Sequence, residues 1–206
     1  MEWAFSCYHA GLIQKVQGKS RNMRVIAGTA KGHQLIGPDR RSTRPATDLV
    51  RGAIFSMLEN LASDWSLVLD LYSGTGAMGI EALSRGAGWA DFVDRQRRCC
   101  DIIKRNLEKT KLSDRAHVYC CEVENAISFL DKEYSIIIMD PPYRNRAIGE
   151  TISRLAKSRL VGAQTIVVVT HSSHLTLEPV YPPLSLIKER RHGDSCIAIY
   201  HKEEIA

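Results

Sequence analysis

The fold of this chain is decided by the stretch Asp70-Leu71-Tyr72-Ser73-Gly74-Thr75-Gly76-Ala77-Met78-Gly79. It includes the end of a short apolar run, Leu67–Leu71, that predicts a buried strand, and it opens a predicted helix at Ala77–Ser84. Its glycines have the spacing G-x-G-x-x-G, and Asp94 ends the next predicted strand 20 residues after Gly74. A strand, a glycine-rich turn and a helix in this order are typical of the first unit of a Rossmann-like fold.

Asp70 bears on which ligand this loop binds. A pyrophosphate seated on the loop would meet its carboxylate with little water between, and the two like charges would repel each other. S-adenosylmethionine carries an ammonium and a sulfonium there instead, so a methyl donor fits better than a dinucleotide. We expect Asp94 to bind the ribose hydroxyls and Glu122, after the third strand, to meet the adenine edge. The predicted cofactor-binding residues are Asp70, Tyr72, Ser73, Gly74, Thr75, Gly76, Asp94, Arg95 and Glu122.

From residue 67 onward, predicted strands and helices alternate, which indicates an α/β fold with a parallel, doubly wound sheet. The expected strands are residues 67–71, 91–93, 117–120, 136–139 and 165–169, and the expected helices are residues 77–84, 97–109, 124–130 and 146–158. Two further strand-like runs, residues 184–188 and 195–200, are expected to form an antiparallel pair at one edge.

A second motif follows the apolar run Tyr134–Met139 and reads Asp140-Pro141-Pro142-Tyr143. Prolines lack N–H donors and have a fixed φ, so the chain must leave the sheet here as a stiff loop. The loop offers a carboxylate, carbonyl groups and an aromatic ring, which suit a planar group that carries an NH2. An ordinary turn at the end of a strand would have similar residues. The predicted catalytic residues are Asp140, Pro141, Pro142 and Tyr143.

Charge is distributed unevenly along the 206 residues. Residues 1–60 hold nine lysines and arginines against four acids, whereas the remaining 19 basic and 19 acidic residues balance. A basic front end on a neutral body predicts a polyanionic partner that is reached from one side.

The composition also predicts the cellular setting. No apolar run reaches the 18 residues of a membrane span, and the first 22 residues make a poor signal peptide. The six cysteines contain no C-x-x-C pair, and the seven histidines show no ligand spacing beside them. We therefore expect a cytoplasmic protein with reduced thiols, no membrane contact and no metal.

The N-terminal region is expected to precede the catalytic sheet as an appendage. Residues 1–22 predict a loose arm or upstream extension, residues 23–62 a basic hairpin, loop and helix, and residues 63–206 the Rossmann-like domain. Residues 24–28 and 33–36 predict the β-hairpin, and apolar residues at helical spacing from Ala46 to Leu61 predict the helix. Arg51 is expected on the polar face of that helix, and Arg44 just before its first turn.

Several stretches together resemble a known family. They are Arg24-Val25-Ile26-Ala27-Gly28, Thr43-Arg44-Pro45-Ala46-Thr47-Asp48 with Val50-Arg51, Asp70-Leu71-Tyr72-Ser73-Gly74-Thr75-Gly76, Glu81-Ala82-Leu83-Ser84-Arg85-Gly86-Ala87, Asp140-Pro141-Pro142-Tyr143 and His192-Gly193-Asp194. Between about residue 23 and residue 200 the chain resembles the bacterial 16S ribosomal RNA guanine-N2 methyltransferases known as the methyltransferase D family. Leu49, Gly52 and Glu122 depart from the family's pattern.

The resemblance implies a class I S-adenosylmethionine-dependent methyltransferase with a mostly parallel, seven-stranded sheet, an N-terminal β-hairpin and a helix. It implies methyl transfer to the exocyclic N2 of a guanine in 16S rRNA, within a small ribosomal subunit or an assembly intermediate. We expect the protein to act as a monomer. The residues expected to bind the RNA substrate are Lys31, Arg40, Arg41, Arg44, Thr47 and Arg51.

Three other functions remain open from the sequence. A DNA adenine-N6 methyltransferase shares the Asp140-Pro141-Pro142-Tyr143 motif, but only about 60 residues lie outside the catalytic sheet for target recognition. An NAD-dependent oxidoreductase would use the glycine loop but leaves that motif unexplained. A non-catalytic RNA-binding assembly factor could retain the same fold without turnover.

Overall fold

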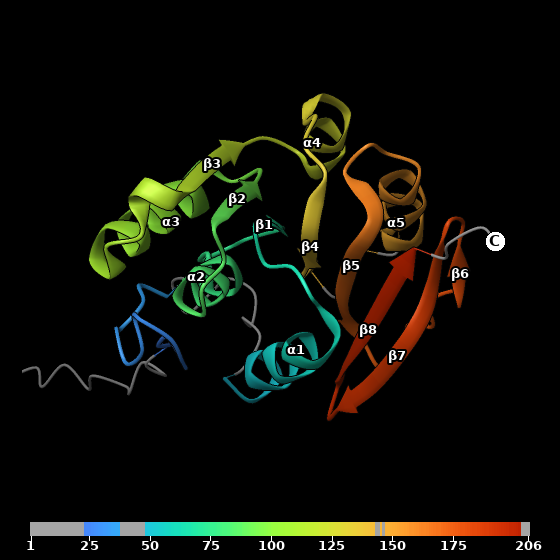
Figure 1. Ribbon diagram of the computed structural model, residues 1–206, viewed down its shortest axis with the longest axis horizontal. Coiled ribbons are helices and arrows are strands. Elements are labelled where there is room, and N and C mark those ends of the chain that lie inside the picture. The colour runs from blue at the N-terminus through green and yellow to red at the C-terminus, as the bar shows by residue number, and fades with distance from the viewer. Residues whose placement is uncertain (1–22, 38–47, 143–144, 146, 203–206) are drawn as a thin grey trace, which may run out of the picture.

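The computed structural model describes residues 23–37, 48–142, 145 and 147–202, which form an α/β fold (Figure 1). Its strands are β1 Leu67–Leu71, β2 Trp89–Asp94, β3 Ala116–Cys120, β4 Tyr134–Met139, β5 Val161–Ser172, β6 Val180–Tyr181, β7 Leu184–His192 and β8 Ser195–Lys202. Its helices are α1 Asp48–Leu61, α2 Ala77–Ser84, α3 Arg97–Thr110, α4 Val123–Phe129 and α5 Ile148–Ala156, with a 3-10 turn at Ser113–Arg115.

The described strands form one sheet in the order β3-β2-β1-β4-β5-β8-β7-β6. The five strands from β3 to β5 are parallel, and β8, β7 and β6 extend the sheet by antiparallel pairing. The mostly parallel α/β fold is therefore confirmed. The expected number of seven strands is wrong by one, because the two-residue strand β6 pairs with β7 and makes an eighth.

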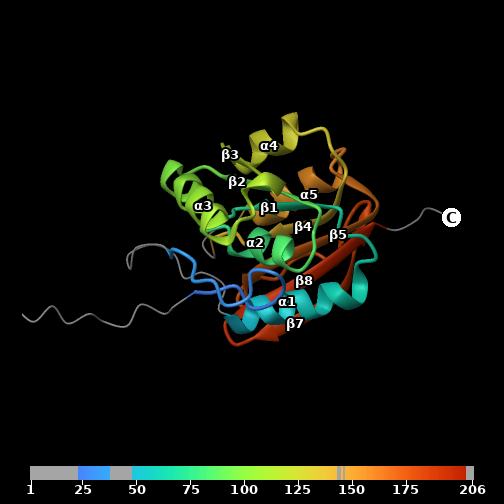
Figure 2. The ribbon, with the colours of Figure 1, turned by 60° about the vertical axis from the view of Figure 1, so that its left-hand side comes forward.

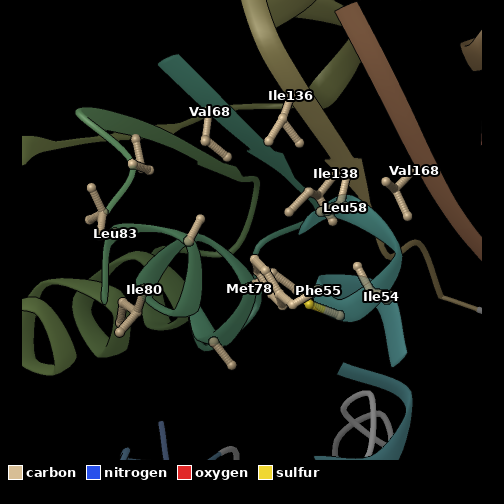
Figure 3. Packing of buried hydrophobic residues seen from close by; sticks show 14 of the residues in the cluster. Ile54, Phe55, Leu58, Val68, Met78, Ile80, Leu83, Ile136, Ile138 and Val168 are labelled. Carbon is tan, nitrogen blue, oxygen red and sulfur yellow. The ribbon is translucent and has the colours of Figure 1, made fainter. Parts of the chain in front are cut away.

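Two helical layers cover the sheet, with α1, α2 and α3 on one face and α4 and α5 on the other (Figures 1 and 2). Neighbouring strand residues point to opposite faces, so Ile136 and Ile138 pack toward the first layer and Ile137 toward the second. Both faces are buried, which explains why these strands are continuous apolar runs in the sequence. Figure 3 shows Ile54, Phe55 and Leu58 of α1 packing with Met78 of α2 beneath the sheet.

Element boundaries agree closely with the sequence wherever a local pattern sets them. β1 and α2 have the expected bounds, whereas β5 runs from Val161 to Ser172 instead of residues 165–169. β5 extends past residue 169 because Ile166 to Ser172 pair with β8, which lies further along the chain, and it starts earlier because Val161 pairs with Tyr134 on β4.

The N-terminal segment is less regular than a β-hairpin. Arg24 and Gln34 form an isolated antiparallel bridge, and the Val25 and Leu35 amides donate to the carbonyls of His33 and Met23. The expected pair of strands is therefore reduced to a hydrogen-bonded loop. Its apolar residues Met23, Val25 and Leu35, together with those of α1, are buried in the same core as the first face of the sheet.

No helix in the described part of the chain has both the length and the apolarity to cross a bilayer.

Candidate active site

The predicted acids gather where the parallel strands end. Asp70 is the residue before the last one of β1, Asp94 ends β2, and Asp140 directly follows β4. β1 and β4 are neighbours, and the chain continues from β1 toward β3 but from β4 toward β5. The order of the strands therefore reverses between Asp70 and Asp140, which is where ligands of such sheets bind. The Asp140 amide donates to the Leu71 carbonyl across this point at 3.4 Å.

Asp70 is buried beneath the glycine loop, with 1% of its surface exposed. Its Oδ2 accepts the Gly79 amide at 2.9 Å, while Oδ1 is buried and has no hydrogen-bond partner among the described residues. Burial raises the pKa of Asp70 from 3.8 to about 8, and the nearby carboxylates of Asp140 and Asp94 add to this rise, while the Gly79 hydrogen bond opposes it. A cationic ligand would satisfy Oδ1, so the site fits the ammonium of S-adenosylmethionine.

The glycine loop is fixed by backbone contacts. The Ser73 amide and hydroxyl both donate to the Val93 carbonyl on β2, which ties the loop to the neighbouring strand. Gly74 and Gly76 have φ values of 56° and 77°, a conformation that costs glycine little. Thr75 is buried and its carbonyl accepts the Asn106 side chain of α3 at 2.9 Å.

Asp94 closes the other side of the loop. Its Oδ2 accepts the Gly74 amide and its Oδ1 accepts the Gln96 amide, at 2.9 and 2.8 Å. These two bonds fix the orientation of the carboxylate. Each carboxylate oxygen can accept more than one hydrogen bond, so Asp94 can also accept the hydroxyls of a ribose.

Glu122 and Arg95 lie at the outer rim of this region, whereas Tyr72 packs against the core on the second face of the sheet and its hydroxyl is buried. Glu122 precedes α4 and its carboxylate lies 3.6 Å from the guanidinium of Arg95, with both side chains more than half exposed. Tyr72 has a φ of 61°, and burial raises the pKa of its hydroxyl. The geometry therefore leaves Glu122 accessible for an adenine edge but does not fix it as tightly as Asp94.

Asp140 is oriented by a residue that sequence reasoning missed. The Thr170 hydroxyl on β5 donates to Asp140 Oδ1. Thr170 is a buried polar residue that directly follows the apolar run Val167–Val169, and that break in pattern was the available signal. The Pro142 carbonyl accepts the Asn145 amide at 2.8 Å, whereas no donor to the Pro141 carbonyl is found among the described residues. Tyr143 lies outside the described residues.

A small hollow opens beside this motif. It is shallow and open to solvent, with about 10 Å3 of space, which is room for about one water molecule, and it is lined by Pro141, Pro142, Asn145, Ile148, His171, Ser172 and Leu175. The predicted motif therefore borders a concave surface next to Asp140.

The expected RNA-binding residues are only partly described. Lys31 lies exposed in the N-terminal loop, whereas Arg40, Arg41, Arg44 and Thr47 lie outside the described residues. The prediction for Arg51 is wrong, because this side chain is 1% exposed. Arg51 donates to the Arg24 carbonyl and to Asp48, and its Nε lies 3.9 Å from the buried carboxylate of Glu81. It binds the N-terminal segment to the core.

Comparisons with known proteins agree with this geometry. The protein-family model described as "Conserved hypothetical protein 95" matches residues 23–201. Ribosomal RNA small subunit methyltransferase D of Escherichia coli is 31% identical, over 89% of this chain and 92% of that protein. YlbH of Bacillus subtilis, provisionally named as an rRNA methyltransferase, is 33% identical over 87% of this chain and 99% of that protein.

A solved structure supports the fold as well. The Escherichia coli protein yhhF, provisionally described as a methyltransferase, superposes with a TM-score of 0.78 and 27% identity. The match covers 89% of this chain and 99% of that one, so the whole architecture is shared.

Proposed function

The chain belongs to the methyltransferase D family of rRNA-modifying enzymes, and from that premise we propose that it methylates the exocyclic N2 of a guanine in 16S rRNA. The methyl donor is S-adenosylmethionine. The observation that carries the proposal is the pair Asp70 and Asp140 on either side of the switch point, one beneath the glycine loop and the other directly before the two prolines that leave the sheet.

The residues present fit the donor. The buried Oδ1 of Asp70 would accept the ammonium, the glycine loop lets the backbone approach the amino-acid part, and Asp94 would hold the ribose. When bound, S-adenosylmethionine supplies an electrophilic methyl group whose departure leaves a neutral thioether.

Asp140 and the Pro141 carbonyl would hold the target amine. The lone pair of an exocyclic purine amine is delocalised into the ring, so the nitrogen is a weak nucleophile. Two acceptors for its N–H groups would hold it in line with the methyl group and favour a pyramidal nitrogen. Thr170 fixes the Asp140 carboxylate for this role. One N–H proton would pass to water as the N–CH3 bond forms, and we propose that Tyr143 stacks on the base.

The substrate is reached from the basic side of the chain. A base within a helix must be unpaired or extruded to reach Asp140, at a cost of a few kcal/mol. We propose that Lys31, Arg40, Arg41, Arg44 and Thr47 contact the RNA backbone, and that the protein acts as a monomer on a small ribosomal subunit or an assembly intermediate in the cytoplasm.

The test is methyl transfer from labelled S-adenosylmethionine to unmodified small-subunit particles, to protein-free 16S rRNA and to DNA. We expect label in one guanine of the particles, identified as N2-methylguanosine by nuclease digestion and mass spectrometry. Asp140→Ala should lower kcat about 100-fold or more while donor binding is retained, because the two acceptors act mainly in the transition state.

Asp131→Ala is the matched control, since Asp131 is an exposed carboxylate that lies before β4, away from the strand's carboxyl end. It should keep wild-type turnover. Label on adenine would overturn the guanine assignment but leave the donor site intact. Donor binding without transfer to any substrate would favour an assembly factor without catalysis.

A further inference from the structure

Three potential metal ligands lie together on the strands that extend the parallel sheet. His171 on β5 pairs directly with Cys196 on β8, and Glu189 on β7 pairs with Ala198, two residues further along β8. Because residues two apart share a face of a sheet, all three side chains lie on the same side. Their ligand atoms all lie within 4.8 Å of one another, and the described residues contain no other such group.

His171 offers the clearest sign that a cation belongs here. It is 3% exposed, and its Nδ1 lies 3.0 Å from the Ser172 carbonyl. A carbonyl can only accept, so Nδ1 carries a proton and a neutral ring leaves a bare lone pair on Nε2. That atom is buried and has no hydrogen-bond partner among the described residues, yet it lies 3.3 Å from Glu189 Oε1. Nε2 of His171 and Oε1 of Glu189 are both acceptors, so a proton or a metal ion must lie between them.

Cys196 completes the set with a soft ligand. It is 9% exposed, and its Sγ lies within 4.8 Å of the ligand atoms of His171 and Glu189. A cysteine binds zinc as a thiolate, so binding here would release a proton. Arg191 lies opposite Cys196, but its guanidinium donates to the Gly193 carbonyl at 3.0 Å.

From these contacts we propose that His171, Glu189 and Cys196 bind a zinc ion. An imidazole, a carboxylate and a thiolate form a mixed N, O and S set that suits Zn2+ and excludes Mg2+ and Ca2+, which prefer oxygen alone. Two ligands about 2.0–2.1 Å from a tetrahedral zinc are about 3.3 Å apart, the separation of His171 Nε2 and Glu189 Oε1. Glu189 is half exposed, so water would take the fourth position.

The ion would join three strands beside the candidate active site. Thr170, which orients Asp140, directly precedes His171, and His171 also lines the hollow. The zinc proposal does not depend on the proposed function. From the sequence we expected no metal, and the zinc proposal differs from that expectation. The spacing of residues 171, 189 and 196 matches no local zinc motif, so the sequence alone does not reveal this set.

The test uses the full chain, freed of any affinity tag, stripped with a chelator and titrated with Zn2+. We expect about one zinc per chain by elemental analysis, and a rise in Tm as zinc binds the folded state. Substituting Co2+ should give the charge-transfer absorption of a thiolate ligand. His171→Gln and Cys196→Ser should weaken zinc binding by at least about tenfold and should reduce the Tm rise; Cys196→Ser should also abolish the thiolate band.

His174→Gln and Cys120→Ser are matched controls on exposed residues, and both should bind zinc as the wild type does. Glu189→Gln is a third ligand variant that should fold normally, because Glu189 is half exposed and its replacement does not disturb the core. It should also weaken zinc binding. The proposal is overturned if the wild type takes up no stoichiometric zinc and shows no thiolate band. It is equally overturned if the three ligand variants bind zinc like the controls. In that case a proton, and not a metal ion, lies between His171 and Glu189.

Discussion

Asp70 is an acid that the fold makes costly to ionise. It has one hydrogen bond from Gly79, it is shielded from solvent, and two further carboxylates lie nearby. A pKa of about 8 means that the folded protein holds a proton which the unfolded chain, with a value near 3.8, has already released at neutral pH. A bound cation would displace this proton, because a nearby positive charge favours the ionised carboxylate.

This predicts a dependence of stability on pH. The stabilising effect of the bound proton is complete below about pH 4 and is lost as pH rises toward about 8. Asp70→Asn has no proton to lose, so its stability should not show this decrease. Between about pH 4 and pH 8 the wild type should therefore lose a few kcal/mol of unfolding free energy relative to the variant. Urea denaturation at several pH values measures it.

The same substitution should weaken S-adenosylmethionine binding about 10- to 100-fold in calorimetry, because the ammonium loses a charged partner. Wild-type and Asp70→Asn stabilities that run parallel from pH 4 to pH 8 would contradict the raised pKa.

At the scale of elements, α2 can lie close against β2 because residue 79 has no side chain. A Cβ on Gly79 would lie 2.3 Å from the ring of Phe92, which is fully buried and cannot move aside. The third glycine of the fingerprint thus serves helix packing, while its amide serves Asp70.

Gly79→Ala should therefore lower the free energy of unfolding by about 1–3 kcal/mol through overpacking. Gly52→Ala is the matched control, since Gly52 is also helical and an added Cβ meets nothing within 4 Å. That change should raise stability by up to about 1 kcal/mol because alanine favours helix. Equal effects of the two substitutions in urea denaturation would show that the Phe92 contact does not decide the packing.

At the scale of the whole molecule, Glu81 joins the N-terminal segment to the sheet. Its buried carboxylate accepts the amides of Ile26 and Ala27 and the guanidinium of Arg85, and it faces buried Arg51. Burial lowers the pKa of Arg51, and Glu81 and Asp48 oppose this effect. The segment that carries Lys31 is therefore held firmly against the catalytic core.

Glu81→Gln should lower the free energy of unfolding by about 3–5 kcal/mol, because buried Arg51 would lose its buried counterion and keep only half-exposed Asp48. Glu59→Gln is the matched control, since Glu59 pairs with the same Arg85 but is half exposed, and it should cost less than about 1 kcal/mol. A small effect of Glu81→Gln in the same assay would mean that the N-terminal segment does not depend on this carboxylate.

The sequence by itself determined the features that depend on local pattern. Apolar runs and helical spacing were enough for β1, α2 and the parallel sheet, because both periodicities follow from backbone geometry. Asp70, Asp94 and Asp140 could be placed at one edge because parallel strands all end on the same side.

Only the tertiary structure decided the features that depend on distant partners. The helical pattern places Arg51 on the polar face of α1. In the structure its side chain is buried, where it faces Glu81 and donates to the Arg24 carbonyl. The bond from Thr170 to Asp140 and the meeting of His171, Glu189 and Cys196 arise from strand pairings between residues far apart in sequence. Local periodicity carries no information about such pairings, because they are chosen by packing of the complete sheet.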